Sequence, residues 1–456
     1  MSRPSRSWRL VRRAAARRAP WQRAAGTALA ASLALAARAS AGAPPCGPFE
    51  VAAASQPVAN AEPGLSPAAP AGGAILPLAG PAPIDAAAPR GEALLALPKD
   101  ASGAIPTDIE LAPGARVADS YWSPILCATV ARVVGPPDLA PQALVPRPPP
   151  GAAVVANDVY ATAGDEVAPA PAAADAPDPY RSLQYGLDQL GVDAARSLSN
   201  GAGVRVALLD SAPARHRDLP AIDVVALPGD PPPREGVHGT LIAGVVAAVA
   251  HNGFGIEGVA PGARLSALAV CTPQGTSASD RCLLYDLLRG VDRAYDRQAR
   301  IMNLSLVGPD NPLLARSMTR LDELGVLVVA AAGNEGTSRP RYPAAYASVI
   351  GVGAADRERH VHARSNRGLS AEIFAPGVEV LSSVPGDAFA FGTGTSFAAA
   401  HVSGALAVLL GTGASPAEVR AALFRQASAA SEGSDVLWMP PLCDVFARLG
   451  RTCGRP

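Results

Sequence analysis

The pattern of apolar positions changes near residue 180. Beyond it, short apolar runs bounded by turn residues alternate with longer segments of helical periodicity. The runs predict strands at 204–209, 265–270, 301–306, 326–331 and 348–353, and the periodic segments predict helices at 238–250, 281–298, 312–324, 395–410 and from Ser415 onward. Buried strands that alternate with helices are typical of a mostly parallel sheet covered by helices on both faces. The expected fold class is therefore α/β, with its site at the carboxyl ends of the strands.

The segment before this domain, residues 42–177, has a different composition. It is dominated by Ala, Pro and Gly, and contains few aromatic residues. We expect a largely irregular N-terminal extension, a propeptide or a linker, with one apolar island at 121–134 around Cys127. An alternative is that this segment is itself functional, as a stalk that binds a cell wall or a partner. The remaining division is the α/β domain at 178–430 and a C-terminal extension at 431–456.

The first 41 residues have the order of a secretory signal. Eight Arg and no acidic residue lie within residues 1–23, an uncharged Ala- and Leu-rich run follows at 24–37, and Ala39-Ser40-Ala41 fits a cleavage site. We therefore expect export to the periplasm or the medium, with membrane contact only during export. The alternatives are an uncleaved anchor and an Ala-rich linker. The pair Arg12-Arg13 lacks the apolar residues that should follow it in a twin-arginine signal.

Charge and cysteine content exclude some classes of protein, such as nucleic-acid-binding and zinc proteins. The chain has 39 basic and 39 acidic residues, so no basic field for nucleic acid is expected. Six cysteines fit an oxidising destination and predict disulfides. Cys271 lies close to Cys282 and Cys443 close to Cys453, which leaves Cys46 and Cys127, but the sequence alone leaves the connectivity open. No Cys-x-x-Cys and no His-Glu-x-x-His occurs, so a zinc site or a zinc peptidase has no support.

Two residues with possible chemistry lie at strand and helix ends. Asp210 directly follows the predicted strand 204–209, and His238 opens the predicted helix 238–250. The positive end of a helix disfavours imidazolium, so we expect His238 to be a neutral base. Each residue also has a simpler interpretation, Asp210 as a turn residue or cap and His238 as a structural histidine.

Two further residues complete the chemistry. Ser396 lies in a glycine-rich lead into a helix of small residues, 392–404, where its own backbone N–H and the helix dipole can hold an oxyanion. Asn334 follows the buried run 326–331, where its amide can donate to the same oxyanion. The simpler interpretations are a helix cap for Ser396 and a turn residue for Asn334. His401 is expected to be a core histidine rather than a second base.

These residues occur in the order Asp, His, Asn, Ser, and the stretches around them resemble the subtilisin family (subtilases, S8). The resemblance covers 178–430 and is carried by 178–187, 206–219, 238–244, 258–263, 303–306 with 331–336, and 374–377 with 394–404. It implies a three-layer subtilisin-like fold and a serine endopeptidase with the triad Asp210, His238 and Ser396 and the oxyanion donor Asn334. Protein or peptide substrates and a monomer are expected. The chemistry needs no cofactor; calcium is common in the family, but we assign no metal ligands.

The resemblance also implies where a substrate lies. An extended peptide would run along one strand and face a wall on the other side, with main-chain pairing for affinity and pockets for preference. The residues expected to bind it are Ser305, Leu306, Val307 and Gly308 on the strand and Ala331, Ala332 and Gly333 on the wall. The simpler interpretation of both segments is a core strand and a tight turn.

Four positions depart from the family pattern. Ala212 and Val307 replace Gly, Leu241 replaces a second His, and Ala400 replaces Pro. The first, third and fourth of these affect packing more than chemistry, whereas Val307 adds bulk where the substrate should run. We expect Val307 to narrow or shift the specificity.

Subtilases are commonly made as zymogens, and residues 42–175 stand in the place of a prosegment. Residues 154–160 faintly resemble the end of one, so we expect self-processing near 160–178, although the segment is too rich in Pro and Ala to match a compact inhibitory domain. The competing hypothesis is a non-catalytic binding protein on the same scaffold. The presence of all four site residues argues against it.

Overall fold

The structure is a computed structural model that describes most of the chain beyond residue 87. The described residues are 88–98, 105–106, 109–164, 166–169, 178–227, 229–273, 279–339, 341–369, 372–431 and 434–454. All of them belong to one compact unit, residues 49–456. The signal expected at 1–41 and Cys46 lie outside the described residues.

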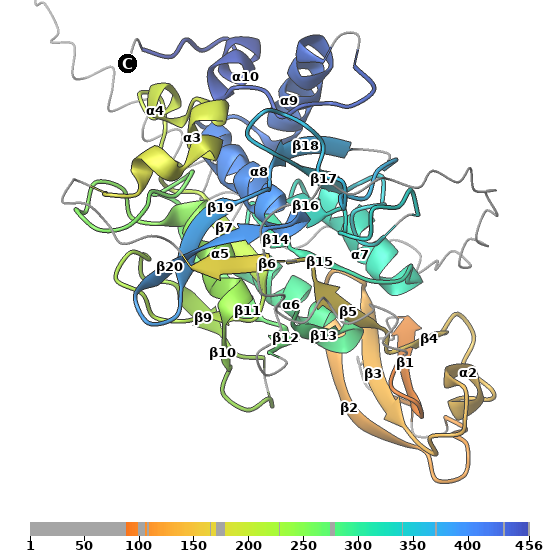
Figure 1. Ribbon diagram of the computed structural model, residues 1–456. Helices are drawn as coiled ribbons and strands as arrows, with labels where there is room; N and C mark the ends of the chain where they lie inside the picture. Colours follow the sequence, from red (N-terminus) through yellow and green to blue (C-terminus); the bar gives the residue numbers. More distant parts are fainter. Residues whose placement is uncertain are drawn as a thin grey trace, which may run out of the picture. The chain divides into compact units, whose positions relative to one another are not determined.

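A seven-stranded sheet forms the centre of the domain, and every pairing in it is parallel (Figure 1). Its strands, in spatial order, are β18 (Glu372–Pro376), β17 (Ile350–Ala355), β16 (Leu327–Ala331), β14 (Ile301–Leu304), β7 (Arg205–Asp210), β11 (Arg264–Ala269) and β9 (Asp223–Val225). The predicted α/β class with a parallel sheet is confirmed. The runs at 204–209, 265–270, 326–331 and 348–353 form strands within two residues of the predicted bounds.

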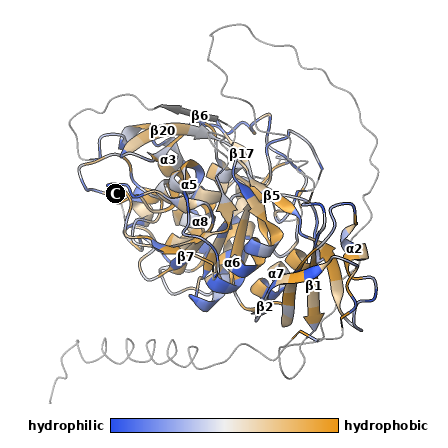
Figure 2. Ribbon diagram, turned by 90° about the horizontal axis from the view of Figure 1, so that it is seen from below, coloured by the Kyte–Doolittle hydropathy of each residue, from blue (hydrophilic) through white to orange (hydrophobic). Residues whose placement is uncertain are grey.

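Helices cover both faces of this sheet, because successive strand residues point to opposite sides. In β7, Val206 and Leu208 join a core with helices α5 (Val237–Ala247) and α8 (Thr395–Leu410). Ala207 and Leu209 join the opposite core with α6 (Leu284–Asp296) and α7 (Pro312–Glu323). The first core also takes in α3 (Tyr185–Leu190), α4 (Val192–Ala195), α9 (Pro416–Ala430) and α10 (Leu442–Arg448). The central strands are mostly orange in Figure 2, as doubly covered strands should be.

Two predicted elements differ in their bounds for a shared reason. The helix predicted at 281–298 begins only at Leu284, because 281–283 form strand β13 (Arg281–Leu283). The strand predicted at 301–306 ends at Leu304, and β15 (Leu306–Val307) follows after Ser305. Both short strands pair with β5 (Val159–Thr162), which lies far away in the sequence. Local periodicity cannot show a strand whose partner is supplied by a distant segment.

The expectation of a largely irregular extension is wrong for its described part. A four-stranded antiparallel sheet forms there, in the order β2 (Arg116–Ser123), β3 (Ala128–Val134), β1 (Glu92–Pro98) and β4 (Ala153–Ala156), with a short helix α2 (Pro141–Leu144). The Ala- and Pro-rich composition conceals short runs of Leu and Val. These runs are long enough to give the sheet two apolar faces.

The two faces of this small sheet have different partners. Along β1, Ala93, Leu95 and Leu97 pack with residues of α2 and β3. Leu94 and Ala96 point the other way and share a core with α6 and α7 of the large domain. The sheet is therefore attached to the large domain through helix α6.

Three small sheets complete the description. One has the order β12 (Cys271–Thr272), β13, β5 and β15; a second has the order β19 (Val380–Val384), β20 (Ala388–Thr393) and β6 (Glu166–Pro169). The third pairs β8 (Ala212–Pro213) with β10 (Glu235–Gly236). Strands of the N-terminal extension thus join two sheets of the large domain, as Figure 1 shows for β5 and β6.

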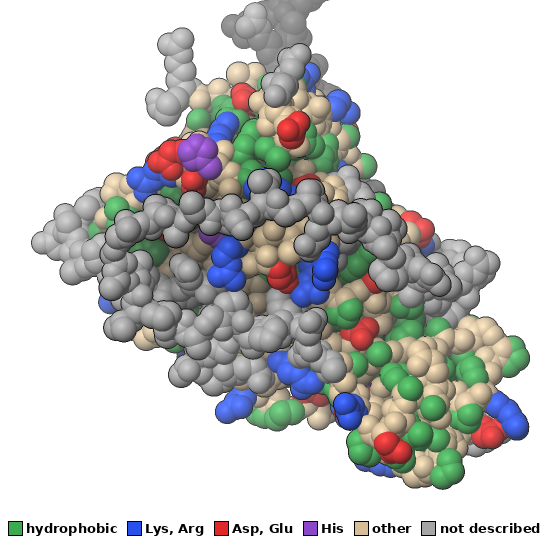
Figure 3. All heavy atoms as spheres, turned by 45° about the vertical axis from the view of Figure 1, so that its right-hand side comes forward, with side chains coloured by type: hydrophobic (Ala, Val, Ile, Leu, Met, Phe, Trp, Pro, Cys, Tyr) green, Lys and Arg blue, Asp and Glu red, His purple; other side chains and the backbone are tan. Residues whose placement is uncertain are grey.

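Both pairs of cysteines that lie close together in the sequence form disulfides. Cys271 is bonded to Cys282, and Cys443 to Cys453. Cys127 is also disulfide-bonded. No helix among the described residues is long and apolar enough to cross a bilayer. On the face shown in Figure 3, the visible basic and acidic side chains are interspersed, and neither sign gathers into a patch that would suit a polyanion.

Candidate active site

Asp210 and His238 meet at the carboxyl end of the central strand β7. Asp210 is the last residue of β7, and His238 lies in the first turn of α5. The His238 Nδ1 is 2.9 Å from both carboxylate oxygens of Asp210, and both side chains are buried. Because Nδ1 faces a carboxylate, the neutral ring carries its proton there and leaves Nε2 as the acceptor.

The protonation of His238 differs from the expectation drawn from its place in the helix. Burial lowers the pKa of His238, but the Asp210 charge and hydrogen bond, with a smaller contribution from the Asp280 charge, outweigh burial and raise the pKa. A carboxylate in contact stabilises imidazolium more than the helix end destabilises it. The arrangement thus favours a ring that can take up a proton.

Ser396 lies at the start of α8 and is completely buried. Its Oγ donates a hydrogen bond to the Ser305 carbonyl oxygen at 3.1 Å. The His238 Nε2 is buried and has no hydrogen-bond partner among the described residues. The hydroxyl therefore points away from the imidazole, and a rotation about the Cα–Cβ bond is needed before the two can exchange a proton.

Asn334 is held by the same helix start. Its Oδ1 accepts hydrogen bonds from the Thr395 N–H and the Thr395 hydroxyl, both at 2.9 Å. The Thr395 hydroxyl oxygen in turn accepts from the Gly333 N–H at 3.0 Å. With its oxygen occupied in this way, Asn334 presents its NH₂ group to the site. Thr395, which directly precedes Ser396 in the chain, is thus a positioning residue that the sequence pattern did not predict.

The NH₂ group of Asn334 has a partner from the chain itself. Asn334 Nδ2 donates to the Ala163 carbonyl oxygen at 2.5 Å, and the Ser396 N–H points at the same oxygen at 3.4 Å. Two donors thus converge on one carbonyl oxygen beside the Ser396 hydroxyl. This is the geometry in which a carbonyl group is polarised for attack.

The residues before Ala163 form an extended strand in the cleft. Strand β5 lies between β13 and β15 and is antiparallel to both. The Ala163 N–H continues the pairing by donating to the Ser305 carbonyl oxygen at 3.0 Å. Val307 and Ala331 pack against the Ala163 side chain. A Cβ at Gly308 would lie 2.2 Å from Tyr160 Cδ1, so the Tyr160 ring rests directly on the Gly308 backbone.

Five of the seven positions expected to bind a substrate therefore line this segment. They are Ser305, Leu306, Val307 and Gly308 on the strand and Ala331 on the wall. The other two have their backbone groups engaged elsewhere. Ala332 bonds to Val352 and Asn366, and the Gly333 N–H bonds to Thr395.

Asp280 is a charged residue of the site that no sequence signal singled out. It is 3% exposed and faces Thr162, whose N–H donates to the Asp280 carbonyl oxygen at 3.2 Å. Burial raises the pKa of the Asp280 carboxyl; the His238 charge lowers it, the Asp210 charge raises it and a hydrogen bond from Ser211 lowers it. The site thus holds a second carboxylate near the imidazole, brought there only by the path of β13.

His401 and the replaced family positions belong to the core. His401 is buried in α8, its Nδ1 lies 2.9 Å from the Phe397 carbonyl oxygen, and burial lowers its pKa to about 4. Ala212, Leu241 and Ala400 are buried among apolar neighbours. Among the described residues, none of these four side chains forms a hydrogen bond with the Ala163 carbonyl group.

Comparison with known proteins identifies the domain. The model of the subtilase family, Peptidase_S8, matches residues 201–437. The chain belongs to the subtilase family. It is similar to Subtilisin BL of Lederbergia lenta, at 36% identity over 271 residues that make up 59% of this chain and 98% of that protein. It is also similar to Thermitase of Thermoactinomyces vulgaris, at 34% identity over 269 residues, 57% of this chain and 94% of that protein.

A solved structure agrees with this assignment. The prenylagaramide maturation protease PagA is 28% identical, superposes with a TM-score of 0.50, and is covered over 99% of its length by 57% of this chain. The chain is accordingly a serine-type endopeptidase with the subtilisin-like fold. Its relatives catalyse without a cofactor and often bind structural calcium.

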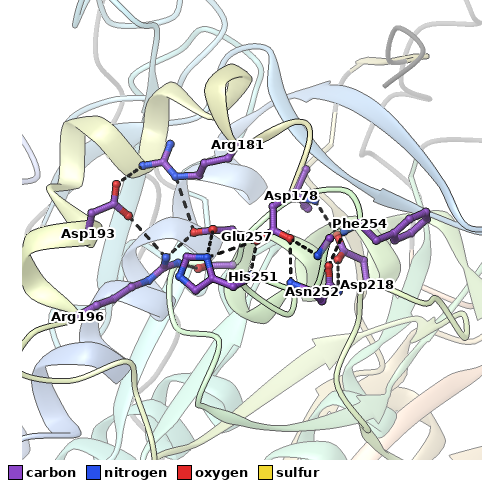
Figure 4. Close-up of polar contacts among 12 residues, drawn as sticks. Asp178, Arg181, Asp193, Arg196, Asp218, His251, Asn252, Phe254 and Glu257 are labelled. Carbon is purple, nitrogen blue, oxygen red and sulfur yellow. Dashed lines mark hydrogen bonds and ion pairs between the residues drawn. The ribbon is translucent and has the colours of Figure 1, made fainter. Parts of the chain in front are cut away.

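The described residues include two groups of three that could in principle hold a metal ion. The first is Asp178, His251 and Glu257 (Figure 4), and the second is the exposed group Asp356, Glu358 and His360. Each group includes a histidine, whereas calcium takes six to eight oxygen ligands. A calcium ion could bind at the more buried group only if its carboxylate oxygens were free of other partners.

The oxygens of the first group are already occupied. Asp178 accepts hydrogen bonds from the backbone N–H groups of His251, Asn252 and Gly253. Glu257 forms ion pairs with Arg196 and, at 3.8 Å, with Arg181 (Figure 4). A divalent cation would have to displace these donors and lie beside two guanidinium groups. The residues present do not fit calcium; hydrogen bonds and arginines take the place of an ion in this loop.

Removal of the Asp178 carboxylate should therefore destabilise the fold in a metal-independent way. Asp178→Ala leaves three backbone N–H groups without their acceptor, and we expect the free energy of unfolding to fall by about 3 kcal/mol. Denaturant unfolding in a Ser396→Ala chain, which is protected from self-digestion, measures this. Asp193→Ala, which removes an exposed partner of Arg181, is the matched control and should cost less than about 1 kcal/mol.

The same chain tests the metal directly. Added calcium or EDTA should shift the unfolding temperature of this chain with and without Asp178→Ala by the same amount, because no described carboxylate of this loop is available to an ion. A rise in the unfolding temperature with calcium that disappears in Asp178→Ala would show that the loop does bind the ion.

Proposed function

We propose that this chain is an exported serine endopeptidase, made as a zymogen whose own segment Val159–Thr162, together with Ala163, occupies the substrate site. Asp210, His238 and Ser396 form the catalytic triad, and Asn334 and the Ser396 N–H form the oxyanion hole. The observation that carries the proposal is the Ala163 carbonyl group, which receives both donors beside the Ser396 hydroxyl. Protein and peptide chains are the substrates.

The reaction follows from the positions of these groups. Ser396 Oγ attacks the carbonyl carbon of the bond to be cut and gives its proton to His238 Nε2. The negative charge that develops on the carbonyl oxygen is held by Asn334 and the Ser396 N–H. His238 then passes the proton to the leaving amine, and a water molecule, activated by the same ring, hydrolyses the acyl-enzyme.

Asp210 supports each of these proton transfers. Its hydrogen bond to Nδ1 fixes the ring so that Nε2 faces Ser396, and its charge stabilises the imidazolium that forms. The raised pKa of His238 is consistent with this role. Catalysis by these groups requires no metal or other cofactor.

The strand β5 indicates how a substrate binds. Ser305, Leu306 and Val307 would pair with its main chain, Gly308 would leave room for a large side chain, and Ala331 would limit the residue before the cut. Ala332 and Gly333 would shape the wall behind it. The apolar neighbours of Ala163 favour a small residue at that position.

The bond poised for cleavage in the zymogen is Ala163–Gly164. This lies at the start of the range expected from sequence, 160–178, and places the end of the prosegment earlier than residue 177. The division of the chain is then a signal at 1–41, a prosegment at 42–163, a peptidase domain that includes 178–430, and a C-terminal extension at 431–456. Export to the periplasm or the medium agrees with the disulfides.

The first prediction concerns maturation. The purified wild-type protein should have an N-terminus at Gly164, and Ser396→Ala should remain uncut at this position and hydrolyse no casein. N-terminal sequencing and a fluorophosphonate label of the serine measure the two effects. A wild-type N-terminus that remains near Gly42 in an active, labelled enzyme would contradict the proposed processing, and labelling of Ser396→Ala would contradict the nucleophile.

The second prediction concerns the oxyanion hole. Asn334→Ala should lower kcat about 10²–10³-fold with little change in KM, since the amide acts mainly on charge that develops in the transition state. Steady-state kinetics on a peptide p-nitroanilide measure it. Asn366→Ala is a control for damage to the wall, because Asn366 bonds to Ala332 and Glu335 rather than to the Ala163 carbonyl group. Equal losses in the two variants would mean that Asn334 is structural.

The third prediction concerns Val307. Its side chain packs on Ala163, so Val307→Gly should widen the pocket and raise kcat/KM for peptides with Leu or Phe before the cut, relative to Ala, by about tenfold. A library of peptides that differ only at this residue measures the preference. An unchanged ranking in Val307→Gly would show that Val307 does not determine specificity.

A further inference from the structure

The cleft holds a carboxylate whose position suits a substrate side chain. Arg281 pairs with Ala161 in the antiparallel register of β13 and β5, so Asp280 stands opposite Thr162. Two backbone-anchored contacts fix this pair: the Thr162 N–H donates to the Asp280 carbonyl oxygen at 3.2 Å, and the Asp280 N–H donates to Thr162 Oγ1 at 2.8 Å. Directly opposed residues in antiparallel strands project to the same face. The Asp280 side chain thus lies beside the residue second before the cut.

The carboxylate of Asp280 is incompletely satisfied, although the Ser211 side chain gives it one hydrogen bond. Its residue is 3% exposed, and its Oδ2 has no hydrogen-bond partner among the described residues. The same oxygen would lie 3.2 Å from a Cβ at Gly236, so no room is left there for a neighbouring side chain. A buried carboxylate oxygen without a donor is costly, and a donor supplied by a ligand would relieve this cost.

We propose that Asp280 is a specificity-determining residue, through which the enzyme prefers a cationic side chain, lysine or arginine, at the second residue before the cut. This inference rests on the proposed function, because it assumes that a substrate binds in the position and register of strand β5. A lysine or arginine in place of Thr162 extends along the same face of the strand as Asp280. Its charged group donates to Oδ2 and forms a partly desolvated, charge-assisted hydrogen bond.

The adjacent imidazole does not oppose this preference. A cation beside His238 would by itself disfavour the imidazolium that forms during the reaction. Asp280 neutralises such a cation, and Asp210 continues to stabilise the ring from its other side. The net charge of the pair formed by Asp280 and a basic residue is therefore close to zero, so the pair has little effect on the imidazolium of His238.

Thr162 in the chain's own segment is compatible with the proposal. The segment is covalently attached and needs no affinity from this position to reach the cleft. Because threonine leaves Oδ2 without a partner, the cleaved segment binds less tightly than a basic peptide would. A substrate with lysine or arginine at this position therefore competes better for the cleft than a substrate without one.

The test uses the wild-type protein after its self-processing and after digestion of the sheet of β1–β4, which otherwise returns β5 to the cleft, and peptides of the form acetyl-Tyr-Ala-X-Ala-p-nitroanilide. With X as Arg or Lys, kcat/KM should exceed the value for X as Gln about tenfold, and the value for X as Glu by more. The preference should decrease as salt is raised. In Asp280→Asn, the ratio of Arg to Gln should fall to about one, while the preference for Ala directly before the cut remains.

The matched control is Asp286→Asn. It removes the same charge from helix α6, where Asp286 pairs with Arg289 outside the cleft, and should leave the ratio unchanged. A wild-type enzyme that cleaves the Arg and Gln peptides equally well overturns the inference. So does an Asp280→Asn variant that loses activity on every peptide by the same factor, since Asp280 would then act only through His238. If no peptide is cleaved by the wild type after the sheet of β1–β4 has been digested, the proposed function itself fails.

Discussion

The site depends on how closely helix α8 approaches the sheet. All sixteen of its residues are buried, and it packs across the central strands and α5. Such an approach requires small side chains: a Cβ at Gly404 would lie 2.6 Å from Val259 Cβ, so even alanine would force the helix away. The start of α8 carries Thr395 and Ser396, and Asn334 is held by Thr395. A shift of this helix would therefore displace the proposed nucleophile and both proposed oxyanion donors together.

The fixed edges of the cleft explain why an internal segment can fill the site completely. Strands β13 and β15 each present one edge to the cleft between them. Strand β5 pairs with both edges, so that the three strands belong to one sheet. The disulfide between Cys271 and Cys282 ties β13 to β12 and keeps this edge in place. Strand pairing that would give affinity to a substrate thus serves the chain's own segment equally well.

Most of the large domain could be predicted from the sequence, because the patterns that specify its strands and helices lie within the short segments that form them. Doubly buried strands such as β7 and β16 are short apolar runs, and α8 is a long run of small residues that begins in a motif. The triad candidates follow those elements directly, so Asp210, His238 and Ser396 could be named in advance. The family assignment confirms the fold and the enzyme class that these residues suggested.

What could not be predicted depends on contacts between distant segments. Strand β13 and strand β15, which follows the break at Ser305, both pair with the distant strand β5, and no local pattern in either carries this information. Asp280 is an ordinary polar residue in a loop until β13 places it opposite Thr162. The sheet of β1–β4 was missed because alanine is common in it, although Leu94 and Leu95 are enough to give one strand two apolar faces.

Cutting the bond after Ala163 would not by itself open the enzyme. Asp292 of α6 accepts hydrogen bonds from the Ser123 hydroxyl at 3.0 Å and the Ile125 N–H at 3.2 Å, and the Tyr285 hydroxyl donates to Asp119 at 2.9 Å. These contacts are independent of the bond that is cut. As long as the sheet of β1–β4 stays on α6, it returns β5 to the cleft at a high effective concentration. Activity on other proteins therefore requires a second event, the removal or digestion of this sheet, and the stability of the sheet on α6 sets how long a processed enzyme stays inhibited.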